Sequence, residues 1–200
     1  MEDLKVKILA RIRGKGRGAV YVSKDFLDLG NRAAVDQALS RLVKAGAIRR
    51  LGRGLFDYPR TNPRLGGELS PAPDLVAEAV ARKRGGRISP SGAHAANALG
   101  LSTQVPGRTV YVTDAPGGSV KVGRQTIAFK RVTPKRVAAK HRVSGAVFEA
   151  LKHLGRDSVD DAVIKHLRTT LSAEDKKILL KESRYAAGWI SDLVKRVVQE

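Results

Sequence analysis

The sequence contains no cysteine, and this absence excludes disulfides, thiolate zinc sites and cysteine nucleophiles together. It also contains no run of about 18 apolar residues, so no segment is predicted to span a membrane. The opening residues, Met-Glu-Asp-Leu-Lys, lack the apolar core of a secretory signal. From these absences we expect a soluble cytoplasmic protein.

Acidic residues are scarce, with 19 Asp and Glu against 38 Lys and Arg and a formal net charge of +19. Residues 1–64 carry 15 basic and 6 acidic side chains, residues 65–142 carry 13 and 4, and residues 143–200 carry 10 and 9. The excess positive charge therefore lies in the first two thirds of the chain. Because basic proteins bind polyanions by displacing counterions from phosphates, nucleic acid is the predicted partner.

Motifs for catalysis are missing as well. The four histidines lie in separate segments and form neither HxH nor HExxH, and the chain contains no GxSxG or SxxK. Asp160 and Asp161 lie in the first turn of a predicted helix, where the helix dipole alone favours acidic residues. The glycine-rich loop at residues 14–18 matches no nucleotide-binding fingerprint. We therefore predict no enzyme activity, no cofactor and no metal site.

The most informative segment that is present runs from Asn31 to Gly46. Apolar residues at offsets 0, 3, 4, 7 and 8 predict one buried helix face, and Asn31 and Gly46 are favoured cap residues. The opposite face carries Arg32, Ala33, Asp36, Gln37, Ser40, Arg41 and Lys44. We predict Arg32, Gln37 and Arg41 as contacts to base edges in a DNA major groove. A merely solvated helix face is the simpler alternative.

The elements around this helix favour the interpretation that its exposed face contacts DNA bases. A helix at 2–13, a strand at 19–22 and a short helix at 24–29, capped by Ser23, are predicted to precede it. A hairpin at 47–58 with the tip Gly52-Arg53-Gly54 follows. This order is that of a winged helix-turn-helix, with residues 31–46 as the recognition helix and the hairpin as the wing. The predicted phosphate and wing contacts are Arg17, Lys44, Arg49, Arg50 and Arg53.

Beyond residue 60 we predict a Pro- and Gly-rich linker at 61–73 and then a basic α+β domain at 74–142. This domain contains a helix capped by Asp74, an alanine-rich helix at 92–99, and strands at 109–113, 119–122 and 124–132. Its cations form either a second nucleic-acid surface or electrostatic support for the winged helix. They are Arg82, Lys83, Arg84, Arg87, Lys130, Arg131, Lys135, Arg136, Lys140 and Arg142.

The last segment, residues 143–200, is predicted to be a helical cap packed with residues 74–142. Ser158 and Ser172 each stand three residues before an aspartate, the spacing of a capping box at a helix start. A partner or dimer surface around Tyr185 and Trp189 is the alternative to simple packing. The predicted fold class is α+β, with an N-terminal winged helix-turn-helix, a small antiparallel sheet with helices, and a C-terminal helical region.

Several stretches match a known family in sequence. They are Gly16–Val22, Lys24–Gly30, Arg32–Leu42, Ile48–Pro59, Ser89–Pro106, Val120–Gly123 and Asp175–Lys181. In these stretches the chain resembles the short form of the AbiEi-type antitoxins of type IV toxin–antitoxin systems. The resemblance implies a prokaryotic antitoxin of phage defence whose winged helix binds its own promoter and represses the operon. It also implies that the rest of the chain neutralises a nucleotidyltransferase-like toxin.

The sequence thus predicts a DNA-binding antitoxin and autorepressor, with double-stranded DNA, a cognate toxin and a second copy on DNA as partners. Two alternatives remain open. One is an RNA-binding module on the central sheet, where Tyr111 and Phe129 are the aromatic residues available for base stacking. The other is a protein-interaction adaptor that uses the winged helix as a scaffold.

Overall fold

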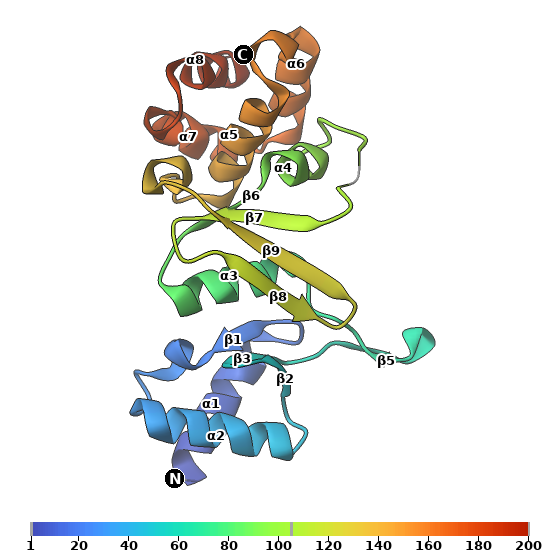
Figure 1. Ribbon diagram of the computed structural model, residues 1–200, viewed down its shortest axis with the longest axis vertical. Helices are drawn as coiled ribbons and strands as arrows, with labels where there is room; N and C mark the ends of the chain where they lie inside the picture. Colours follow the sequence, from blue (N-terminus) through green and yellow to red (C-terminus); the bar gives the residue numbers. More distant parts are fainter. Residues whose placement is uncertain (1, 105, 200) are drawn as a thin grey trace. The chain divides into compact units, whose positions relative to one another are not determined.

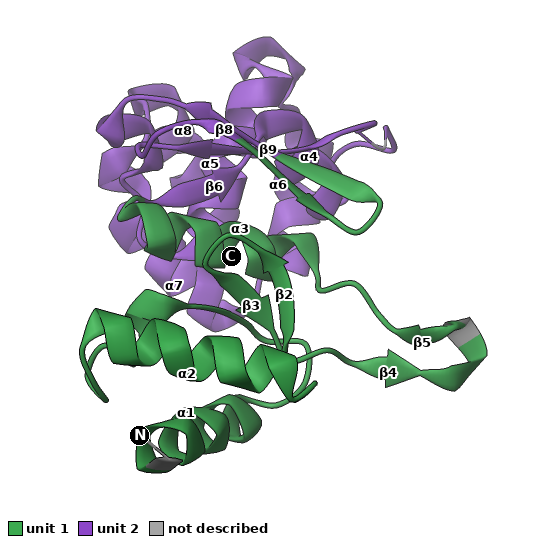
Figure 2. Ribbon diagram, turned by 60° about the horizontal axis from the view of Figure 1, so that its bottom comes forward, with its two compact units in different colours: residues 1–86, 119–127 green, residues 87–118, 128–200 purple. Residues whose placement is uncertain are grey.

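The computed structural model describes residues 2–104 and 106–199 and divides the chain into two compact units (Figure 2). The first unit comprises residues 1–86 and 119–127, and the second comprises residues 87–118 and 128–200. Helices combine with small antiparallel sheets, which confirms the predicted α+β class. None of the described helices is long and apolar enough to cross a membrane.

The first unit begins with the predicted order of helix, strand, short helix, helix and hairpin (Figure 1). The elements are α1 (Glu2–Lys15), β1 (Val20–Val22), the 3-10 helix η1 (Ser23–Phe26), α2 (Arg32–Lys44), β2 (Arg49–Gly52) and β3 (Leu55–Asp57). The three strands form an antiparallel sheet in the order β1-β3-β2, with Tyr21 opposite Phe56. The helices α1 and α2 pack on each other and on this sheet.

Helix α2 begins and ends where the sequence predicts. The Asn31 side chain accepts a hydrogen bond of 2.9 Å from the backbone N–H of Ala34. Gly46 ends the helix with a φ of 66°, a conformation that glycine adopts without steric penalty. The apolar face of α2 is buried against α1, β1 and η1 in a core that includes Ile8, Ile12, Tyr21, Phe26, Val35, Leu39 and Leu42. The opposite face of α2 is consequently left to solvent.

The short helix predicted at 24–29 is wrong in extent and in its cap. The structure has a single 3-10 turn at Ser23–Phe26, and Val22 occupies the N-cap in place of Ser23. The carboxylate of Asp25 accepts a hydrogen bond of 3.0 Å from the Val22 N–H. This bond reaches back across three residues and fixes the start of the turn at Val22.

The segment predicted as a linker contains structure of its own. Strands β4 (Thr61–Asn62) and β5 (Gly67–Glu68) pair antiparallel around the 3-10 turn η2 (Pro63–Leu65). Helix α3 (Pro73–Arg84) follows, with Ala72 rather than Asp74 at its N-cap and Pro73 in its first turn. Helix α3 contacts β1 and η1 and lies in the first unit.

The four-stranded sheet has the strand order β6-β7-β9-β8. Strands β7 (Thr109–Thr113), β8 (Gly118–Val122) and β9 (Gln125–Arg131) correspond to the three predicted strands. Strand β6 (Ile88–Pro90) was not predicted, because three residues containing a proline carry too little periodicity. It pairs antiparallel with β7, with Ser89 opposite Val112. The alanine-rich helix α4 (Gly92–Ala98) follows β6.

The C-terminal segment is helical, as predicted. It contains α5 (Arg142–Leu154), α6 (Asp161–Thr170), α7 (Ala173–Glu182) and α8 (Gly188–Val198), joined in part by short 3-10 turns. Ser172 caps α7 and accepts a hydrogen bond of 3.0 Å from Asp175 N–H, but α6 is capped by Asp160 and not by Ser158. The four helices enclose a core that includes Leu151, Leu167, Leu179, Ile190 and Val194.

Candidate nucleic-acid interface

The solvent face of α2 presents the side chains predicted to contact bases. Gln37, Arg41 and Lys44 are exposed, and within the described residues their side chains form no hydrogen bond or ion pair. Ala33 is exposed beside them, and Ser40 is half-buried. These three long polar side chains are therefore available to a ligand without breaking an internal contact.

Arg32 and Asp36 form an ion pair on the same face. The Nε of Arg32 donates a hydrogen bond of 2.8 Å to the Asp36 carboxylate, one helical turn away. Burial acts to raise the pKa of Asp36, but its hydrogen bonds and the charges of Arg32 and Arg50 prevail and lower it. Asp36 therefore stays ionised and orients Arg32 at the N-terminal end of α2.

The hairpin β2–β3 carries two exposed cations, Arg50 and Arg53. The guanidinium of Arg50 lies over the ring of Phe56, with 5.5 Å between its Cζ and the ring centroid. Arg53 occupies the tip together with Gly54, whose φ of 64° closes the turn. The hairpin thus displays positive charge beside α2, as the sequence predicts for a wing.

Arg49, which the sequence predicts as a phosphate contact, is held by contacts within the first unit. Its guanidinium pairs with the fully buried carboxylate of Asp57 at 2.7 and 3.1 Å, and it also donates to the backbone carbonyl of Leu69 at 2.8 Å. A further ion pair of 3.3 Å joins it to Glu68. Asp57 neutralises Arg49, so Arg49 is a structural side chain that ties the β4–β5 segment to the hairpin.

Arg17 lies apart from the wing cations. Its guanidinium donates a hydrogen bond of 2.8 Å to the Pro59 carbonyl and stacks 4.6 Å from the ring centroid of Tyr58. It lines a small cavity of about 180 Å³ together with Gly46, just past the C-terminal end of α2. Arg17 is exposed, so a phosphate contact there would lie near the opposite end of α2 from Arg32.

Lys83, at the end of α3, joins the wing cations. Its Nζ donates a hydrogen bond to the backbone carbonyl of Arg53, and Figure 2 shows the hairpin reaching α3. Burial lowers the pKa of Lys83, and the charges of Arg53, Arg84 and Arg32 lower it further. The sequence placed Lys83 in the central domain because nothing in its spacing shows that α3 packs against the first sheet.

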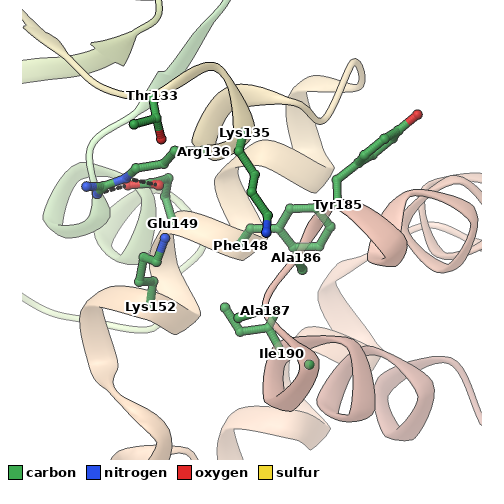
Figure 3. Close-up of a pocket in the computed structure, with 11 residues that line it drawn as sticks. Thr133, Lys135, Arg136, Phe148, Glu149, Lys152, Tyr185, Ala186, Ala187 and Ile190 are labelled. Atoms are coloured by element: carbon green, nitrogen blue, oxygen red, sulfur yellow. Dashed lines mark hydrogen bonds and ion pairs between the residues drawn. The ribbon is translucent and has the colours of Figure 1, made fainter.

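Several cations of the central segment are already paired within their own unit. In the first unit, Arg82 bonds to Asp25 at 3.0 and 3.2 Å. In the second unit, Arg87 bonds to Asp114 at 2.9 and 3.0 Å. Arg136 forms two bonds, of 2.6 and 2.7 Å, with the buried carboxylate of Glu149, and these bonds raise its pKa (Figure 3). These three guanidinium groups are therefore already occupied and would contribute little to a second nucleic-acid surface.

The pair of Arg136 and Glu149 lines a cavity of about 350 Å³ in the second unit. Figure 3 shows Lys135 and Lys152 extending toward the same cavity from either side. Phe148 and Ile190 supply apolar surface to its lining. Within this lining the one carboxylate is held by Arg136, so the two lysines give the cavity a positive character.

The aromatic side chains considered for base stacking are buried. Tyr111 and Phe129 are 2% and 4% exposed, and their rings stack on each other with centroids 6.2 Å apart. His94 packs edge-on against Tyr111 at 5.3 Å. The central sheet therefore offers neither ring to an unpaired base.

The chain matches the model of one protein family. It belongs to DUF6088, a family of unknown function, whose model matches residues 7–179. This match covers both compact units, including the hairpin and most of the C-terminal helices. A comparison with curated proteins finds no match.

Proposed function

We propose that this protein is a winged-helix DNA-binding protein that recognises a specific sequence and represses its own operon. The observation that carries the proposal is the solvent face of α2, where Gln37, Arg41 and Lys44 have no internal partner among the described residues. Arg50 and Arg53 flank this face on the hairpin. The 15 basic and 6 acidic side chains of residues 1–64 supply the electrostatic attraction to DNA.

The exposed side chains of α2 and of the hairpin would make two kinds of DNA contact, to bases and to phosphates. Arginine can donate hydrogen bonds to O6 and N7 of guanine in the major groove, and glutamine can bond to N6 and N7 of adenine. Arg41 and Gln37 would therefore determine the DNA sequence that is bound. Lys44 and Arg53 would bind phosphates, which strengthens binding to every sequence alike. The proposal therefore separates residues that determine specificity from residues that determine overall affinity.

The substitution Arg41→Ala tests this division. If Arg41 pairs with a guanine, the variant should lose about 1 to 3 kcal/mol of binding to the DNA upstream of its own gene. Its binding to random DNA of equal length should fall far less. Fluorescence anisotropy with both DNAs measures the two losses at one salt concentration.

A matched control removes one exposed arginine from the second unit, as in Arg156→Ala. This variant carries the same change in net charge and should bind both DNAs nearly as the wild type does. Equal losses on the two DNAs for Arg41→Ala would show that α2 does not read sequence through this residue.

We further propose that the protein acts as the antitoxin of a type IV toxin–antitoxin pair. This part of the proposal rests on the resemblance to AbiEi-type antitoxins, with a nucleotidyltransferase-like toxin as the target. Expression of the neighbouring gene alone should arrest growth, and expression together with this protein should restore it. Growth arrest that persists in the presence of this protein would refute the antitoxin role and leave the DNA-binding proposal standing.

A further inference from the structure

Helix α3 is anchored in the first unit by its last turn. The guanidinium of Arg82 bonds to the Asp25 carboxylate at 3.0 and 3.2 Å and to the Val20 carbonyl at 2.9 Å. Gly85 then ends the helix with a φ of 72°. These contacts hold the next side chain, Lys83, in a defined place relative to β1 and η1.

Lys83 closes against the tip of the hairpin. Its Nζ donates to the Arg53 carbonyl, and its Cε and Nζ lie 3.6 and 3.7 Å from where a Cβ on Gly54 would stand. The hydrogen bond leaves two of the three ammonium protons of Lys83 for other acceptors. The ammonium group is thus positioned at the wing and is only partly used by it.

The surroundings of Lys83 are positive. Burial lowers the pKa of Lys83, and the charges of Arg53, Arg84 and Arg32 lower it further. Lys83 forms no ion pair with a carboxylate among the described residues, and Asp36 is already bonded to Arg32. Cations gathered in this way repel one another, and a bound anion relieves the repulsion.

We infer that Lys83 and Arg53 form a preformed site for a backbone phosphate of duplex DNA, assembled from α3 and the hairpin. This inference rests on the proposed DNA-binding function. It adds a contact from α3, a helix outside the predicted winged helix-turn-helix. The phosphate would lie beside the wing, where it fixes the register of α2 on the groove without reading sequence.

The test is the salt dependence of DNA binding by Lys83→Gln in the full-length protein. Each phosphate contact contributes about 0.9 to the slope of log K against log salt, so the slope should fall by about 0.9. The drop in affinity between about 50 and 200 mM salt should therefore shrink by about 3.5-fold. Glutamine keeps a donor for the Arg53 carbonyl, and thermal unfolding checks that the variant folds.

Two further variants make the result specific. Lys83→Arg keeps the charge and should keep the wild-type slope. Lys177→Gln removes an exposed lysine from α7 in the second unit and should leave the slope unchanged. Together they separate the local charge at α3 from the net charge of the protein.

Each of the other outcomes would overturn either this inference or the proposed function. Weaker binding by Lys83→Gln with an unchanged slope would show that Lys83 only braces the wing, and would overturn the inference. An unchanged affinity and slope would place Lys83 outside the interface. Failure of the wild-type protein to bind duplex DNA would instead refute the proposed function itself.

Discussion

At the scale of single residues, the carboxylate of Asp57 lies fully buried and depends on Arg49 as its partner. Burial raises the pKa of Asp57 above its ordinary value, although the hydrogen bonds and charge of Arg49 act to lower it. Removing one partner of such a pair leaves an uncompensated buried charge, which costs about 3 to 5 kcal/mol. This contact therefore supports the hairpin that carries the proposed wing.

We expect Arg49→Ala to lower the free energy of unfolding at neutral pH by about 3 kcal/mol. Without Arg49 the folded-state pKa of Asp57 rises further above its unfolded value. A carboxyl group with a raised pKa stabilises the fold fully below its unfolded pKa, and this stability is lost as the pH rises through the folded pKa. The loss caused by the substitution should therefore be largest at neutral pH and shrink toward about pH 4.

Urea unfolding of wild type and variant at each pH measures this difference. The neighbouring substitution Arg50→Ala serves as the control, because Arg50 is exposed and loses only its contact with the Phe56 ring, which should change stability by no more than about 1 kcal/mol. An Arg49→Ala effect as small as that of Arg50→Ala would show that Asp57 does not need its partner.

At the scale of elements, helices α4 and α5 approach each other closely. Ala95, Ala96, Ala146 and Ala150 form a buried cluster between them. At Gly92 an added Cβ would lie 2.5 Å from the Cβ of His153 and 2.9 Å from the Glu149 carbonyl oxygen. Only the lack of a side chain permits this approach.

The substitution Gly92→Ala should therefore destabilise the second unit by about 1 to 3 kcal/mol, because neither the helix backbone nor a Cβ can move aside easily. Gly188→Ala at the start of α8 is the matched control, since no atom lies within 4 Å of its added Cβ. Thermal unfolding of both variants makes the comparison. Equal stabilities would mean that α4 can shift without loss.

The sequence predicted those elements whose signals are local. The caps Asn31 and Gly46 and the apolar spacing between them predicted α2, and the Ser172 capping box predicted the start of α7. Ser158 and Asp74 were assigned as caps wrongly, because the observed caps, Asp160 and Ala72, each stand two positions away and local spacing does not decide between them. Which of two nearby residues caps a helix is decided by the packing of that helix in the fold.

Contacts between distant residues could not be predicted in the same way. Arg49 looked like its exposed neighbour Arg50, and its pairing with Asp57 depends on the register of β2 against β3. Lys83 lies 30 positions from Arg53, and its place at the wing depends on α3 packing against β1. The base-contact face of α2 was predictable because one helical period separates buried from exposed residues.

At the scale of the whole molecule, the proposed DNA contacts lie in the first unit, which carries 20 basic and 9 acidic side chains. The near balance of 10 basic and 9 acidic side chains in residues 143–200 gives the C-terminal helices a different character. These helices enclose an apolar core of their own, into which Trp189 packs half-buried. This distribution fits a chain in which one part binds DNA and another serves a different task.

The central claim is recognition of a specific DNA sequence, and it is tested most directly by an electrophoretic shift with the wild-type protein. The DNA upstream of its own gene competes against random DNA of equal length at two salt concentrations. The account predicts a preference for the upstream DNA that survives the higher salt, because base contacts are less sensitive to salt than phosphate contacts. Equal binding to both DNAs, lost at the higher salt, would contradict it and leave the +19 net charge as the sole source of binding.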